Sequence, residues 1–477
     1  MKINKLNIIA AFLSIASITS CKKTLDVNND PNAFSDGLIT PASLLPSIEV
    51  NLAYALGGDA TRITASLTQH YAGHRSQPLD YAQYNINPSS TDTYWQNMYT
   101  VVLTNTNKMI AKARQAGDST YVGVGQIIEA YAFSVLTDMY GDIPFSDALQ
   151  FAGDMTPAYD KQKDIYNGLF KMLDNGIANV KISAATSITG DMIYRKPANW
   201  EKFANSVKLR LYNHLSATQP NGVTDFLNTN PVLITANSDN AKVIFGITQA
   251  NANPIYQMDV TSGRTDEAVC ATLVDKMKAL NDPRIPVYFN VVQNNGQGYQ
   301  GQYRGNAPGG SQDDASKNLY SRVGTYYASI SSPVILMSAA EVQYIIAEAR
   351  VNSGDQTAAK QAYETAITND FEMLGLSAST AGYLSNPDVA FDGTLKRVME
   401  QKWVTMYQAT YESWTDWRRT GFPELHPAVN NYTSNVIPVR IPYPQSEINL
   451  NAKSLQNGPG IPVPYKSLKV PVWWNTK

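Results

Sequence analysis

His70 and His74 are the first residues whose type and spacing could do chemistry, because two histidines at i and i+4 on a helix can hold a zinc ion. A zinc protease also needs a glutamate directly after the first histidine as general base, and Tyr71 stands there instead. A carboxylate from elsewhere in the chain could still complete a metal site. We predict no metal and no cofactor, and expect the pair to form a polar rim near the start of a loop.

Other catalytic patterns are incomplete. Gly296, Gly298 and Gly301 match the G-x-G-x-x-G pattern of dinucleotide sites, but residues 303–310 are too rich in Gly, Asn and Pro to open the required helix. Carboxylate pairs for glycoside cleavage lie about 5–10 Å apart, which is a tertiary property that a sequence does not reveal. We therefore predict no catalytic residues, and a surface glycosidase or peptidase stays as one alternative.

Cys21 follows a pattern typical of a modified thiol. Residues 1–5 carry two lysines, residues 6–17 are mostly apolar, and Ile-Thr-Ser precedes the cysteine. This arrangement resembles a bacterial lipobox, in which the thiol is acylated and the chain is cut before it. We predict a signal peptide over residues 1–20, lipidation at Cys21 and an acylated tether over 21–45. Two or three acyl chains, at about 0.8 kcal/mol per buried methylene, would hold the protein on a membrane.

The amino-acid composition is typical of a globular protein with little net charge. It is 43% apolar and 16% charged, with a net charge of −2, which argues against a nucleic-acid partner. No stretch after the leader is apolar enough to span a bilayer, so we expect the lipid alone to anchor it. Cys270 then has no partner for a disulfide, and its apolar neighbours predict a core position. The 28 tyrosines suit surfaces that recognise polar ligands, and they also suit ordinary cores.

Apolar periodicity predicts a mainly α protein. Long helices are expected over 95–113, 126–140, 160–180 and 199–216. We predict a single domain over 46–477, with a helical core at 46–220 and 333–420. A loop-rich lobe with a few short strands is expected at 221–332, and an extended C-terminal tail at 421–477.

One helical pair has the spacing of a known repeat. Ala347, Ala359, Tyr363 and Ala366 stand at offsets of small and aromatic residues in a tetratricopeptide unit, with Gly354 in the turn. A single unit cannot bury its own face, so further helices must pack on it. A plain pair of antiparallel helices is the alternative.

Several motifs together resemble those of the SusD/RagB family of outer-membrane nutrient-binding lipoproteins, closest to the branch described as starch-binding and associating with the outer membrane. They are the lipobox with its acidic tether, residues 125–149 with Tyr-Gly-Asp-Ile-Pro-Phe at 140–145, residues 200–211, Asn-Asp-Pro-Arg at 281–284, Val-Tyr-Phe at 287–289, Tyr-Arg-Gly at 303–305, and residues 333–349, 414–421 and 440–444. Their order over nearly all of the mature chain carries the resemblance. We expect most of them to hold the fold rather than to touch ligand.

The resemblance implies a fold, a location and a partner. The fold would be SusD-like, with four tetratricopeptide-like units and an irregular lobe. The protein would sit on the cell surface of a Gram-negative outer membrane, over a SusC-like TonB-dependent barrel transporter. It would bind oligosaccharides or similar oligomeric nutrients without catalysis and deliver them to that transporter.

Two loop segments, 70–95 and 293–327, carry the mixture of tyrosine, amide and charged side chains that sugars and peptides require, and the resemblance places ligand sites in the same two regions. The candidate ligand-binding residues are Arg75, Asp80, Tyr81, Tyr84, Asn85, Tyr94, Trp95, Tyr299, Tyr303, Arg304, Tyr326 and Tyr327. Trp95 opens a helix, so core packing is its alternative role, and each tyrosine could instead contact the transporter.

The ligand itself is left open. Starch, another glycan, a glycopeptide or a peptide all fit these segments. The other functional alternative is a helical-repeat scaffold that binds only protein.

Overall fold

The centre of the fold is α7 (Ser119–Tyr140), whose side chains are buried on nearly every side. A helix that is apolar all round belongs in the interior of a large protein. Asp118 starts it by accepting hydrogen bonds from the backbone N–H groups of Thr120 and Tyr121. Gly141 ends it with a φ of +90°, and a Cβ there would lie 2.9 Å from the guanidinium of Arg440.

The computed structural model describes residues 38–150, 155–183, 185–293, 298–310 and 318–476. The predicted signal peptide, Cys21 and most of the predicted tether lie outside these residues. The chain from Pro41 onward forms one compact unit. In the described part, no helix is both long and apolar enough to cross a lipid bilayer.

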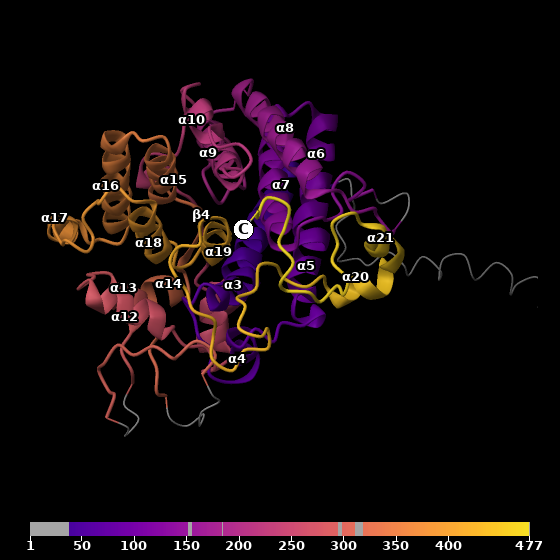
Figure 1. Cartoon of the computed structure of the whole chain (residues 1–477). Coiled ribbons are helices and arrows are strands. Elements are labelled where there is room, and N and C mark those ends of the chain that lie inside the picture. Colours follow the sequence, from indigo (N-terminus) through magenta and orange to yellow (C-terminus); the bar gives the residue numbers. More distant parts are fainter. Residues whose placement is uncertain (1–37, 151–154, 184, 294–297, 311–317, 477) are drawn as a thin grey trace, which may run out of the picture. The chain divides into compact units, whose positions relative to one another are not determined.

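The N-terminal half is helical, as its periodicity predicts (Figure 1). Its elements are α2 (Pro41–Ala55), η3 (Leu56–Ala60), α3 (Thr61–Leu67), α4 (Ser76–Ala82), η4 (Pro88–Ser90), α5 (Asp92–Gln96), η5 (Asn97–Leu103), α6 (Thr104–Ala116), α7, α8 (Gln162–Lys181), α9 (Pro197–His214) and α10 (Gly222–Leu227). The run predicted over 95–113 forms α5, η5 and α6, with a π-helical turn in the middle. Helices α6, α8 and α9 pack around α7.

The middle of the chain consists of short elements, as expected. They are η6 (Asn237–Asp239), β1 (Ala241–Ile244), η7 (Gln249–Asn251), α11 (Pro254–Tyr256), η8 (Gln257–Thr261), α12 (Ala271–Ala279), α13 (Ile285–Tyr288), β2 (Phe289–Asn290), β3 (Arg322–Val323), α14 (Thr325–Ala328) and β4 (Pro333–Met337). Strand β1 pairs antiparallel with β4, with Val243 opposite Val334, and β2 pairs antiparallel with β3. Cys270 is buried here, as predicted.

The last part of the chain returns to helices. They are α15 (Ala339–Asn352), α16 (Gln356–Met373), η9 (Ser377–Ser379), α17 (Thr380–Leu384), α18 (Leu395–Thr405), α19 (Thr410–Thr420), α20 (Gln445–Leu450) and α21 (Ala452–Asn457). Helices α15 and α16 form the predicted pair: Ala347, Tyr363 and Ala366 are buried in one apolar cluster, and Ala359 is buried as well. Gly354 makes the turn with a φ of +82°.

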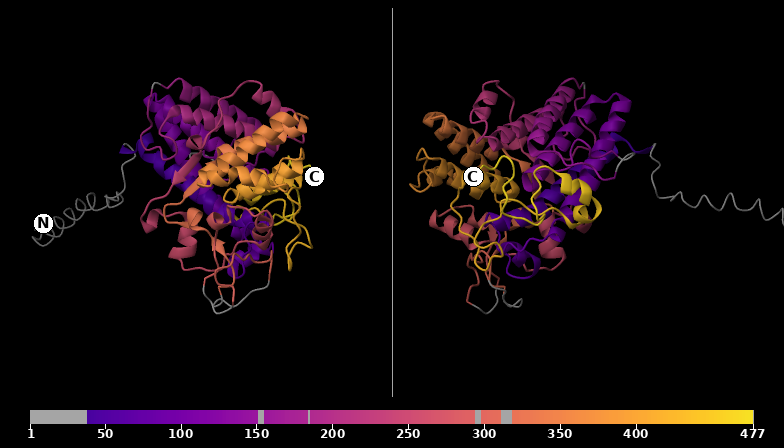
Figure 2. Two further views of the ribbon diagram at one scale, coloured as in Figure 1. Left: turned by 90° about the vertical axis from the view of Figure 1, so that its left-hand side faces the viewer. Right: turned by 45° about the vertical axis from the view of Figure 1, so that its right-hand side comes forward.

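The C-terminal tail differs in part from the extended segment that we expected, because residues 445–457 form α20 and α21. It lies over the helices of the N-terminal half (Figure 2). Tyr443 donates a hydrogen bond to the carbonyl of Asp142 at 2.7 Å, and the indole N–H of Trp474 donates to Asp138 at 2.8 Å. The tail thus closes the C-terminal end of α7.

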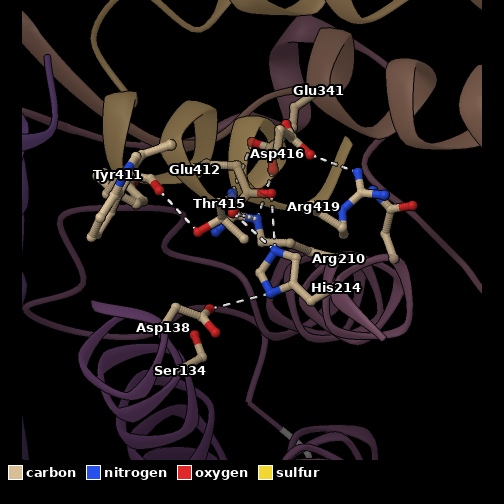
Figure 3. Close-up of polar contacts among 12 residues, drawn as sticks. Ser134, Asp138, Arg210, His214, Glu341, Tyr411, Glu412, Thr415, Asp416 and Arg419 are labelled. Carbon is tan, nitrogen blue, oxygen red and sulfur yellow. Dashed lines mark hydrogen bonds and ion pairs between the residues drawn. The ribbon is translucent and has the colours of Figure 1, made fainter. Parts of the chain in front are cut away.

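A buried ionic cluster joins α7, α9, α15, α18 and α19 (Figure 3). The ring of His214 lies between two carboxylates, with Nδ1 3.2 Å from Asp138 and Nε2 3.0 Å from Glu412. Arg210 pairs with Glu341 at 2.6 Å on the other side of Glu412. Burying charges is tolerated only where each one meets an opposite charge, and here each of them does.

Candidate functional site

The two loop segments singled out in the sequence meet in space. Residues 71–74 run antiparallel to 266–269, with the N–H of Ala72 donating to Ala268 at 2.8 Å and that of His74 to Asp266 at 3.0 Å. From the other loop, the N–H of Asn306 donates to Val269 at 2.9 Å. The side-chain amide of Asn306 then donates to the carbonyl of Ala72 at 3.1 Å, which joins the two loops directly.

A hollow of about 270 Å³ opens beside this junction. Most of the residues that line it are polar or charged, and the full set is His74, Thr265, Glu267, Asn290, Val291, Gln293, Asn318, Leu319, Tyr320 and Arg322. Ligand pockets usually measure about 300–1,000 Å³, so this one suits a single ring-sized group of a longer ligand.

Arg304 forms a stacked platform next to the hollow. Its guanidinium lies 4.2 Å from the ring centroid of Tyr299 and 4.7 Å from that of Tyr320. The same group donates a hydrogen bond to the carbonyl of Leu319 at 2.8 Å. The His74 ring meets Tyr320 edge-on, with centroids 5.2 Å apart. Each cation–π contact contributes about 0.5–2 kcal/mol, so these rings are held in place before any ligand arrives.

Charged groups surround the hollow in pairs. Arg322 pairs with Asp259 at 2.6 Å, and Arg75 lies 3.5 Å from Asp266. Burial raises the pKa of Glu267 to about 7; Arg62, 3.9 Å away, opposes the rise and Asp259 adds to it. The charge on the wall therefore changes near neutral pH.

The histidine pair is not arranged for a metal. The helix α3 ends at Leu67, so His70 and His74 lie on the extended segment that follows it rather than on one helix face. His70 uses both ring nitrogens, at 2.8 Å from Thr68 Oγ1 and 2.8 Å from the carbonyl of Trp403, and burial lowers its pKa to about 4. Within the described ranges, no three His, Cys, Asp or Glu side chains are grouped to hold a metal ion.

Comparison with known proteins gives the family. Residues 31–444 match the SusD-like family whose description is "starch-binding associating with outer membrane". This chain is a SusD-like protein. No curated protein matches it.

Solved structures agree with this fold. A chitin-binding protein is 24% identical, with a TM-score of 0.78 over 92% of this chain and all of the other. A SusD homologue from Bacteroides fragilis is 24% identical, with a TM-score of 0.77 over 92% of this chain and all of the other. A SusD homologue from Bacteroides uniformis is 26% identical, with a TM-score of 0.75 over 91% of this chain and 99% of the other.

Five of the predicted ligand residues are buried in this SusD-like protein: Tyr81, Tyr84, Tyr94, Trp95 and Tyr327. The hydroxyl of Tyr84 accepts a hydrogen bond from the N–H of Ala428 at 3.1 Å, and the Tyr327 ring packs against Tyr407. Because these five side chains are buried, a ligand cannot stack on the faces of their rings in this conformation. Trp95 borders a different hollow, next to α20.

Arg75 is also buried, and its guanidinium donates to Thr265 Oγ1 at 2.6 Å, on the wall of the hollow. The other six candidates keep some exposure. Asn85 donates to Asp80 at 3.0 Å, and Tyr326 donates to the carbonyl of Met373 at 3.1 Å. Tyr299, Tyr303 and Arg304 lie on the loop beside the hollow and are partly exposed.

Several residues of the hollow were not among the predicted candidates. Tyr320 and Arg322 belong to the predicted loop 293–327, and His74 was expected at a polar rim near the start of the other loop. Thr265 and Asn290 lie in short segments that show no distinctive pattern. Their place at the site follows from the pairing of residues 266–269 with 71–74, for which the sequence carries no signal.

Proposed function

We propose that this chain is a cell-surface lipoprotein that binds oligosaccharides, or similar oligomeric nutrients, at the hollow between its two loops. It delivers them to a SusC-like TonB-dependent barrel transporter and does not cleave them. The observation that carries the proposal is the meeting of two loops, far apart in the sequence, beside a hollow lined mainly by polar residues, with the stack of Tyr299, Arg304 and Tyr320 next to it. Membership of a family described as starch-binding supports the choice of a glycan.

The chemistry of the hollow suits a sugar ring. Tyr299 and Tyr320 offer aromatic planes for C–H faces, and Arg304 holds both in position. The amides of Asn290, Gln293 and Asn318 can pair with hydroxyls. The description of one structural relative as chitin-binding favours the same class of ligand.

Binding without catalysis is supported by the placement of carboxylates. Glycoside cleavage normally needs two carboxyl groups on either side of the bond. Among the described residues of the wall, Glu267 is the one carboxylate. The carboxylates of the central ionic cluster are buried and paired with cations, and the hollow beside them measures about 10 Å³, which is room for about one water molecule.

Calorimetry with starch, chitin and peptide oligomers tests the proposed ligand class. Tyr299→Ala combined with Tyr320→Ala should weaken glycan binding by about tenfold or more, because stacking is lost. Tyr121→Ala is the matched control, since this half-buried tyrosine lies at the start of α7, outside the hollow. Release of shorter products, or binding that is insensitive to the double substitution, would contradict the proposal.

The anchor and the partner need separate tests. Labelled palmitate should mark the full-length chain but not the Cys21→Ala variant. A barrel transporter should co-purify with the wild-type chain from native outer membranes. A chain that takes no label and is recovered alone would argue against both.

A further inference from the structure

A second hollow measures about 470 Å³, within the usual range for ligand pockets, and is lined by α5, η5, α20 and the described residues between Pro144 and Pro157. It shares no wall residue with the hollow between the loops. The backbone N–H of Ser446 in α20 donates to Asp92 in α5 at 2.8 Å, which holds two of its sides together. Both helices appear side by side in Figure 1.

The floor of this hollow is aromatic and fixed. The rings of Trp95 and Tyr99 lie 4.6 Å apart, and the Tyr99 hydroxyl donates to the carbonyl of Pro144 at 2.7 Å. Leu450 borders the hollow from α20 with 78% of its surface exposed. Such a floor and rim can bury an apolar group that enters from solvent.

The charged residues of the wall are acidic. Asp147 and Glu447 line it, and its described residues include no lysine, arginine or histidine. Two more carboxylates stand just behind: Asp92 accepts from Ser446, and Asp160 accepts from the N–H of Phe145 at 3.0 Å. Like charges around a hollow with apolar walls focus an electric field that attracts cations and repels anions.

We propose that this hollow is a second binding site, for a hydrophobic amine: an aromatic or aliphatic group that carries a positive charge. The apolar body lies over Tyr99 and the edge of Trp95, and the ammonium group faces Asp147 and Glu447. This site works independently of the glycan site between the loops.

Three probes with the same indole ring separate shape from charge. Tryptamine is cationic, indole-3-ethanol is neutral and indole-3-propionate is anionic. Ligand-observed NMR titrations on the purified mature chain should give tryptamine the tightest binding, about tenfold tighter than the propionate. Equal binding of all three, or a tryptamine Kd weaker than about 1 mM, would overturn the proposal.

Two variants locate the binding. Thr100→Trp fills the hollow from an exposed position on η5 and should abolish tryptamine binding. Asp147→Asn with Glu447→Gln keeps the shape and should weaken tryptamine severalfold while leaving indole-3-ethanol unchanged. Glycan binding should stay intact in both variants, so failure here is distinguishable from failure of the loop site. Tryptamine binding that neither variant changes would refute the assignment.

Discussion

His214 has both ring nitrogens against carboxylates, and a neutral imidazole has only one N–H to donate. The ring is therefore protonated, and Glu412 and Asp138 outweigh burial and raise its pKa to about 9. This pKa lies above the value of about 6.5 for an unfolded histidine. The charged ring of His214 therefore stabilises the folded protein fully below about pH 6.5, and this stabilisation is lost as the pH rises toward 9.

We expect His214→Gln to lower the free energy of unfolding by about 3–5 kcal/mol at neutral pH, because it leaves buried charges unpaired. The difference from wild type should shrink between about pH 6.5 and 9, as the histidine loses its proton. Urea unfolding of the variant and the wild type at several pH values measures this difference in the free energy of unfolding. A difference that stays constant across this range would contradict the assignment of charge.

Arg284 shows what one of the family motifs does. It is fully buried and pairs with Asp282 at 2.6 Å and with Asp370 at 2.8 Å, which ties the loop-rich lobe to α16. Arg284→Leu should destabilise the fold by about 3–5 kcal/mol, because two buried carboxylates lose their partner. Arg264→Leu is the control: this arginine is half exposed in its pair with Asp266, so removing it should cost at most about 1 kcal/mol in the same unfolding assay.

At the scale of elements, α7 and α8 approach closely because glycines face each other. A Cβ on Gly123 would lie 2.8 Å from the carbonyl of Gly176 and 2.9 Å from the backbone nitrogen of Val180. Gly123→Ala should therefore force the helices apart and cost about 1–3 kcal/mol, despite the better helix propensity of alanine.

Gly382, in the short helix α17, is the matched control, because a Cβ there would meet nothing within 4 Å. Gly382→Ala should stabilise the protein by up to about 1 kcal/mol. Thermal unfolding of both variants compares the two glycines. Equal effects would show that propensity, and not close packing, decides at Gly123.

The helices could be predicted because their signals are local. Apolar spacing marks α7 to α9, and the four small and aromatic residues of α15 and α16 carry their own repeat pattern. The site could be predicted only by region. Tyr81 and Tyr299 look alike in the sequence, yet the first is buried near Arg62 and the second stacks on Arg304. Such differences arise from contacts between distant segments, which no local pattern encodes.

At the scale of the whole molecule, the C-terminal end of the described chain is anchored in the interior, against α7 and α19. Trp474 is buried, its indole donates to Asp138, and the guanidinium of Arg418 lies 4.7 Å from its ring. Trp474→Ala should destabilise the fold by about 3–5 kcal/mol, as for other large buried rings. Trp473→Ala should cost clearly less, because the neighbouring ring is 38% exposed. Chemical denaturation of both variants tests this, and equal losses would contradict it.

The contact between Trp474 and Asp138 spans 336 residues. Residues near 474 therefore cover buried charges that belong to helices synthesised much earlier. Until Trp474 docks, the carboxylate of Asp138 lacks this indole partner and the end of α7 is open to water. This part of the fold is thus completed only after most of the chain has been made.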